Sequence, residues 1–185
     1  LLSCVRQLGG KSLSFNNLND LNAARRIAAD LSDPSCVIVK HANPCGVASG
    51  RVVDEAYAGA LASDPVSAFG GVVVLNRPIE RDLALVIANQ FIEVILAPDF
   101  SDEAVEILSS RENMRILASS DSYFSASDNR DFRRVLGAML VQEADSGGAE
   151  CEDMKVATKS KPSQAQWDDL LFAWSVVKHV ASNAI

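Results

Sequence analysis

Short apolar, β-branched runs alternate along this chain with segments of helical periodicity, and no other feature constrains the fold as much. The runs at residues 72–75 and 91–97 are continuously apolar except for Glu93, as expected for strands that are buried on both faces of a sheet. Strands that alternate with helices predict crossover connections, a mainly parallel sheet, and helices on both of its faces. The sequence therefore predicts a single α/β domain over residues 1–185.

The expected elements follow one another without an internal repeat. Helical spacing of apolar residues predicts helices over residues 20–31, 53–61, 82–88, 104–108 and 163–181. The first helix is expected to have Asn19 or Asp20 as its N-cap, and the last has a capping box between Ser163 and Gln166. Strands are expected over residues 36–39, 72–75, 91–97, 115–117, 135–141 and 155–158, and the polar stretch 119–131 is expected to be a loop.

The polar chemistry of the sequence is concentrated at the end of the first of these strands. Lys40 and His41 follow a buried apolar run, and Asn43, Pro44 and Gly46 are expected to turn the chain there. Open α/β sheets bind ligands at the carboxyl ends of their strands, so a cation and a base at this place predict a site. A strand end that is merely exposed to solvent is the alternative interpretation.

Two further features lie beside expected strands. The segment Ser67–Gly71 opens directly onto a strand; Gly70 would let a ligand approach the backbone, and Phe69 offers a face for stacking. An ordinary turn is the alternative. Glu93, within an apolar strand, is either at the sheet edge or directed at a ligand. If the sheet is parallel, Lys40, Gly70 and Glu93 should lie near one edge of it.

Composition and charge exclude several classes of protein. A net charge of −7 with 48% apolar residues argues against nonspecific nucleic-acid binding and against disorder. No apolar run reaches the length of roughly 18 residues that spans a membrane, and the first residues do not have the pattern of a signal peptide. The four cysteines are scattered without a CxxC pair, which predicts free thiols in a cytoplasmic protein. Packing is favoured over a nucleophilic role for Cys45, and His179 is expected at the surface.

The segment Lys40-His-Ala-Asn-Pro-Cys-Gly-Val-Ala48 resembles the hallmark of the 5-aminoimidazole-4-carboxamide ribonucleotide (AICAR) transformylase domain. That domain belongs to the bifunctional purine-biosynthesis enzymes, whose other part is an IMP cyclohydrolase. Further segments resemble the family in the family's order, so that the resemblance covers essentially the whole chain: Leu13–Asn17, Ser63–Gly71, Phe91–Pro98, Val141–Gln142, Val156–Thr158 and Ser182–Ile185. The resemblance implies a cytidine-deaminase-like three-layer α/β/α fold with a mainly parallel sheet, and a cytoplasmic homodimer with active sites at the subunit interface.

The resemblance also implies a reaction, the transfer of a formyl group from the cosubstrate 10-formyltetrahydrofolate to the 5-amino group of AICAR, with no metal required. In that reaction His41 would be the proton acceptor and Lys40 would stabilise the oxyanion. The residues that match nucleotide contacts of the family are Asn17, Gly70, Glu93 and Asn183, and further substrate or folate contacts are expected from Asn43, Ser67 and Phe69. We therefore expect Asn17, Lys40 and Asn183 to converge on one cleft.

Some parts of the family pattern are expected outside this chain. The resemblance makes residues 1–185 the first of two deaminase-like halves, without the cyclohydrolase domain and without the Arg-Tyr segment that grips the phosphate. Because positioning contributes much of catalysis, the isolated chain is expected to be inactive or nearly so. Two alternatives remain. A non-catalytic structural or dimerisation fragment is one. A zinc deaminase is the other, although Asn43 replaces the required glutamate and no second cysteine follows Cys45 at the required spacing.

Overall fold

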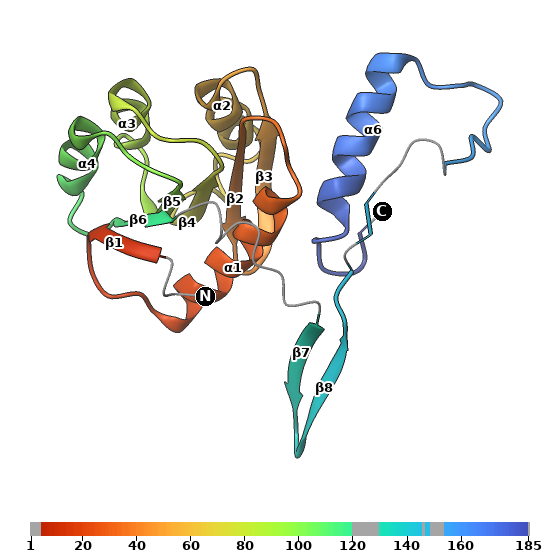
Figure 1. The fold of residues 1–185 in the computed structure, drawn as a ribbon, viewed down its shortest axis with the longest axis horizontal. Coiled ribbons are helices and arrows are strands. Elements are labelled where there is room, and N and C mark those ends of the chain that lie inside the picture. Colours follow the sequence, from red (N-terminus) through yellow and green to blue (C-terminus); the bar gives the residue numbers. More distant parts are fainter. Residues whose placement is uncertain (1–4, 120–129, 146, 149–153, 185) are drawn as a thin grey trace.

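A six-stranded sheet forms the centre of the protein. The computed structural model describes residues 5–119, 130–145, 147–148 and 154–184 (Figure 1). Along the sheet the strands have the order β1-β6-β5-β4-β2-β3. Their bounds are β1 (Val5–Gly9), β2 (Ser35–Lys40), β3 (Asn43–Ser49), β4 (Gly71–Leu75), β5 (Ile92–Ala97) and β6 (Arg115–Ser119). The predicted α/β class is confirmed.

The sheet is mixed rather than parallel throughout. β4, β5 and β6 run parallel and are joined by α3 (Arg81–Ile87) and α4 (Asp102–Ser109), the crossover helices that parallel neighbours require. β1 is antiparallel to β6, and β2 is antiparallel to both β3 and β4. The prediction of parallel strands therefore holds for β4, β5 and β6 and fails for the flanking strands.

β3 was not predicted from the sequence. Pro44 and Gly46 were expected to lie in a turn, but both belong to this strand and pair with Val39 and Ile38 of β2. β3 is an edge strand, where proline is tolerated. Glycine is needed at position 46 because a Cβ there would lie 2.0 Å from the carbonyl oxygen of Ala60 in α2 (Val53–Ser63). Turn-forming residues thus serve close packing of a strand on a helix.

Helices cover both faces of the sheet, as predicted, and give three α/β/α layers (Figure 1). On one face, Leu21 and Ile27 of α1 (Phe15–Ala29) pack in a core with Val37 and Val72. α2, α3 and α4 build the core on the other face. Because both faces are buried, β4 and β5 are apolar except at Glu93.

The first helix begins earlier than predicted. Its N-cap is Ser14 rather than Asn19 or Asp20, and the Ser14 hydroxyl accepts a hydrogen bond from the backbone N–H of Asn17. The Asn17 side-chain oxygen accepts in return from the backbone N–H of Ser14, at 3.1 Å. This capping box uses Asn at its third position, where the usual pattern has Glu or Gln, which explains why the sequence signal was missed.

The C-terminal third differs most from expectation. A single strand over residues 135–141 was predicted, but the chain forms a hairpin of β7 (Arg130–Val135) and β8 (Ala138–Glu143). Gly137 has φ +74° and allows the turn between them. Residues 155–158 do not form the predicted strand. Of the expected loop 119–131, residues 120–129 lie outside the described part of the chain.

The last helix, α6 (Gln164–Val177), has the predicted capping box between Ser163 and Gln166. Its predicted apolar face is not buried against the described residues: Leu170 is 48% exposed and Trp174 54% exposed. α6 and the β7–β8 hairpin stand beside the three-layer body in Figure 1. Among the residues described, no helix combines the length and apolar character that crossing a membrane requires.

Candidate functional site

The site begins at the two-residue turn between β2 and β3. His41 has φ 54° and Ala42 has φ 63°, as in a type I′ turn, which normally carries Asn-Gly. A left-handed backbone costs an ordinary residue roughly 1–2 kcal/mol. The carboxylate of Asp20, on α1, accepts a 2.7 Å hydrogen bond from the N–H of Ala42 and holds the turn. The turn therefore presents the His41 side chain at an exposed, strained tip.

The ammonium of Lys40 is held by the loop before β4. Its Nζ atom donates to the carbonyl oxygens of Gly70, at 2.7 Å, and Phe69, at 3.2 Å. An ammonium has three N–H donors, and the two carbonyl oxygens take two of them within the part of the chain that the structure describes. Gly70 has φ +68°, and its N–H donates a 2.7 Å hydrogen bond to the carbonyl oxygen of Phe91. Lys40 and Gly70 are thus neighbours, as predicted.

Lys40 and Gly70 lie together for a different reason from the one predicted. Lys40 ends β2, but β2 is antiparallel to β4, so its carboxyl end lies beside the amino ends of β4 and β5. The expected meeting of carboxyl ends of parallel strands is therefore wrong. Adjacent strands are about 4.8 Å apart, so the ends of β2 and β5 lie about 10 Å from one another.

An exposed aromatic pair borders the Lys40 ammonium. Phe69 is 65% exposed and Phe91 44% exposed, and their ring centroids are 4.9 Å apart with the planes tilted by 38°. Phe69 was predicted as a site residue, whereas Phe91 was expected only as part of a strand. The sequence signal that could have indicated Phe91 as a site residue is an aromatic side chain immediately before the buried strand β5. The pair offers an apolar surface next to a cation.

Glu93 is directed toward α1 by a β-bulge. Gly71 pairs with Ile92 and Val72 pairs with Val94, which leaves Glu93 as the extra residue of β5. Its carboxylate accepts a 2.9 Å hydrogen bond from the side-chain amide of Asn17, which is 3% exposed. Glu93 is thus on an inner strand, not at the sheet edge, and the structure joins it to a second predicted site residue.

Asn43 connects the turn to the segment that follows α6. Its side-chain oxygen accepts a 3.0 Å hydrogen bond from the N–H of Ala181. Asn183 follows two residues later and is exposed. The structure therefore brings the C-terminal segment to the corner of Lys40 and His41, where Asn183 was expected.

His179 is not the surface residue that was predicted. Its Nε2 atom lies 2.6 Å from a carboxylate oxygen of Asp30, the C-cap of α1, and Lys178 Nζ lies 2.8 Å from the same oxygen. Burial lowers the pKa of His179 below its ordinary value of 6.5 although the contact with Asp30 opposes this, so at pH 7 the imidazole is neutral and its Nε2–H donates to the carboxylate. Partial burial alone would raise the pKa of Asp30, but the hydrogen bonds from Lys178 and His179 lower it. Lys178 is therefore the cation of this cluster.

Two other predicted residues have structural contacts. The N–H of Ser67 donates to the Asp64 carboxylate at 2.9 Å and shapes the loop before Gly70. Hydrogen bonds from the Ser67 side chain and from its backbone N–H lower the pKa of Asp64. Cys45 is the extra residue of a bulge in β3, and its Sγ lies 3.6 Å from the carbonyl oxygen of Ile38. Burial raises the pKa of the Cys45 thiol, which fits the packing role assigned to it.

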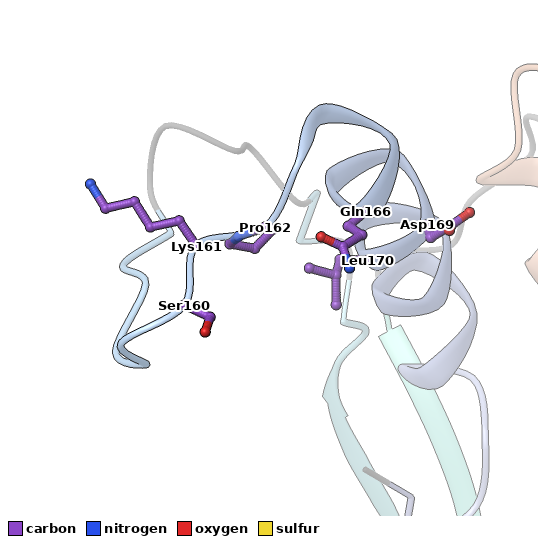
Figure 2. A pocket seen from close by; sticks show the side chains of 6 residues that line it. All are labelled: Ser160, Lys161, Pro162, Gln166, Asp169 and Leu170. Carbon is purple, nitrogen blue, oxygen red and sulfur yellow. The ribbon is translucent and has the colours of Figure 1, made fainter.

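The described residues contain no group of three His, Cys, Asp or Glu side chains placed to hold a metal ion. They do form a shallow hollow of about 360 Å³ at the start of α6 (Figure 2). Its lining residues are Ser160, Lys161, Pro162, Gln166, Asp169 and Leu170. None of these is among the predicted site residues, so the candidate site is the surface corner around Lys40.

The sequence profile of one protein family, described as AICARFT/IMPCHase bienzyme, matches residues 1–185. The chain belongs to this bienzyme family. The resemblance stated from the Lys40–Ala48 segment is thereby confirmed.

Similar members of the bienzyme family carry the name "Bifunctional purine biosynthesis protein PurH". The protein of Rhodospirillum rubrum is 46% identical over 184 residues, which are 100% of this chain and 35% of that protein. The protein of Thermoanaerobacter sp. is 48% identical over 179 residues, 97% of this chain and 35% of its own length. That of Halalkalibacterium halodurans is 44% identical over 98% of this chain and 35% of its length. The chain thus spans about a third of these relatives.

A solved structure, that of Acinetobacter baumannii RibD (form 1), overlaps 55% of this chain and 33% of its own, with a TM-score of 0.39 and 16% identity.

Proposed function

We propose that this chain carries the catalytic pair for formyl transfer from 10-formyltetrahydrofolate to the 5-amino group of AICAR, a step of purine biosynthesis in a bifunctional enzyme. The observation that supports it most is the fixed ammonium of Lys40, held by the Gly70 and Phe69 carbonyls beside the strained His41 turn. A cation and an imidazole on adjacent residues suit a reaction in which an oxyanion and a proton develop together.

The two side chains have separate roles in this reaction. The amine nitrogen attacks the formyl carbon, and its lone pair is weakly nucleophilic because it is delocalised into the imidazole and carboxamide. His41 accepts the amine proton, and the Lys40 ammonium stabilises the negative charge on the formyl oxygen. The bond from the formyl carbon to N10 then breaks, N10 takes up a proton, and tetrahydrofolate leaves.

The remaining site residues hold the substrates. Asn17, Gly70, Glu93 and Asn183 contact the nucleotide. Phe69, Asn43 and Ser67 border the site, and the apolar face of Phe69 and Phe91 fits a flat heterocycle. The Asn17–Glu93 hydrogen bond fixes a carboxylate within reach of the amine and carboxamide of the substrate. Convergent donors and acceptors at one corner support this assignment.

The setting of the site belongs to the same proposal. In this proposal the α/β/α layers belong to a cytidine-deaminase-like domain, of which residues 1–185 would be the first of two halves. The complete enzyme is a homodimer that contains the IMP cyclohydrolase part. The relatives are about three times as long as this chain, which supports a site completed by other parts of the protein. By itself the chain lacks part of the substrate grip and is inactive or nearly so.

The test is the variant His41→Ala in the complete enzyme, with tetrahydrofolate formation followed spectroscopically. Loss of a positioned base should lower turnover by about 10²–10⁴-fold, while nucleotide affinity measured by calorimetry stays within a few-fold. Arg51→Ala is the matched control, because Arg51 is exposed at the far end of β3 and pairs only with its neighbour Glu55 among the described residues. If His41→Ala kept more than a tenth of wild-type turnover, the base role would be wrong.

A further inference from the structure

Among the described residues, three contacts hold the segment after α6 against α1 and the β2–β3 hairpin. Lys178 and His179 both contact the Asp30 carboxylate, at 2.8 and 2.6 Å, and the Ala181 N–H donates to Asn43 at 3.0 Å. Asp30 is the C-cap of α1, and Asn43 is the first residue after the His41 turn. These contacts span the distance from the far end of α1 to the candidate site.

The contacts to Asp30 are unlike an ordinary surface ion pair. The side chains of Lys178 and His179 are only 13% and 9% exposed, and that of Asp30 is 33% exposed. Charged hydrogen bonds that are partly withdrawn from water lose more when one partner is removed than solvated pairs do. One turn earlier on α1, the pair Arg26–Asp131 is much more open, with side chains 36% and 43% exposed.

The path from this cluster to the site is short. Two residues of chain extend at most about 7 Å, so Asn183 lies within that distance of Ala181, whose N–H is bonded to the β2–β3 hairpin. The position of Asn183 therefore depends on how residues 178–181 are held. Asn43 holds the near end of this segment, and Asp30 holds the far end.

We propose that Asp30 is a positioning residue for nucleotide binding: by binding Lys178 and His179 it fixes the segment 178–184, so that the Asn183 side chain meets the substrate beside Lys40 and His41. This inference rests on the proposed function, in which Asn183 contacts the nucleotide. Asp30 touches no reacting atom, and its effect should appear in substrate affinity and not in the chemical step.

The experiment compares Asp30→Asn, Asp30→Glu and Asp131→Asn in the complete enzyme. Loss of the charged contact in Asp30→Asn should raise the nucleotide KM and Kd by roughly tenfold or more, with kcat and the folate KM within about twofold. Asp30→Glu keeps the charge and should recover part of the affinity. Asp131→Asn breaks the more exposed ion pair of the same helix and should leave nucleotide affinity unchanged.

A double-mutant cycle separates positioning from general stability. If Asp30 acts through Asn183, Asn183→Ala should weaken binding strongly in the wild-type background and only weakly in Asp30→Asn. The inference would be overturned by additive effects of the two substitutions, or by unchanged nucleotide affinity in Asp30→Asn. The proposed function would still stand in either case if the wild-type enzyme transfers the formyl group. Should Asp30→Asn fail to fold, His179→Phe, which removes the hydrogen bond but keeps the ring, gives the same comparison. A wild-type enzyme without formyl transfer would overturn the proposed function itself.

Discussion

The Lys40 ammonium donates a 2.7 Å hydrogen bond to the carbonyl oxygen of Gly70, a residue 30 positions later in the chain. This bond joins the end of β2 to the loop before β4, and it depends on the antiparallel pairing of the two strands. The N–H of Gly70 also donates a hydrogen bond to the carbonyl oxygen of Phe91. Gly70 therefore fixes both the cation and the aromatic pair of the candidate site.

The substitution Gly70→Ala should damage the site directly. A Cβ at this position would lie 3.0 Å from Lys40 Nζ and 3.2 Å from Phe91 Cε1, at a φ of +68°. The left-handed backbone alone should cost about 1–2 kcal/mol of unfolding free energy, and the displaced ammonium should lower formyl-transfer turnover tenfold or more. Urea unfolding and steady-state kinetics measure the two effects. Gly148→Ala is the control, since a Cβ there meets nothing within 4 Å; equal effects at both glycines would contradict the argument.

The amide of Asn17 has a double structural role that Asn17→Ala removes. The Asn17→Ala variant loses the capping hydrogen bond between the Asn17 side chain and the Ser14 N–H, at 3.1 Å, and the hydrogen bond to Glu93, at 2.9 Å. We expect a loss of about 1–3 kcal/mol in stability, together with weaker nucleotide binding. Asn17→Asp keeps the capping oxygen but places a second carboxylate against Glu93, so its stability should improve as pH falls through the carboxyl range. Asn89→Ala, at the exposed end of α3, should change stability by less than about 0.5 kcal/mol.

The left-handed backbone of the turn at His41 and Ala42 is expected to lower the stability of the protein. Asn is favoured over His in a type I′ turn, so His41→Asn should raise the free energy of unfolding by about 0.5–1 kcal/mol while it abolishes formyl transfer. Ala42→Gly relieves the φ of 63° next to it and should also stabilise the hairpin, with the imidazole retained. Chemical denaturation of both variants tests this relation. A destabilised His41→Asn protein would mean that the imidazole makes a stabilising contact.

Acidification should weaken the attachment of the C-terminal segment. Burial lowers the pKa of His179 from its ordinary value of 6.5, although Asp30 opposes this, and the cations Lys178 and Arg26 lower it further. The unfolded chain then binds a proton before the folded chain does, so stability falls as pH drops below about 6.5. Asp30, whose pKa is lowered, loses its contribution only at still lower pH.

Urea unfolding between pH 5.5 and 7.5 measures this effect in wild-type protein and in His179→Gln, which does not titrate. As pH falls, the free energy of unfolding of the wild-type protein should decrease relative to that of His179→Gln. Parallel pH profiles would show that His179 titrates alike in the folded and unfolded chain.

The sequence by itself determined the elements whose residues carry their own signal. Apolar runs rich in β-branched residues predicted β4 and β5, because a strand that is covered on both faces is apolar at nearly every position, and Glu93 in the bulge of β5 is the exception. The Ser163–Gln166 capping box marked the start of α6, because that signal is local. The Lys40–Ala48 segment, together with the further matching segments along the chain, indicated the family.

Only the tertiary structure decided how these elements meet. The residue types of Pro44 and Gly46 predicted a turn, but pairing with β2 and close packing on α2 make both residues part of a strand. The direction of β2 relative to β4 depends on the β2–β3 hairpin, which was not predicted from the local sequence. The antiparallel direction of β2 places Lys40 at the amino ends of the parallel strands. His179 and Asp30 are 149 residues apart, and no local pattern links them. Propensity and periodicity act over a few residues, whereas the site is made by long-range contacts that form only when the layers pack.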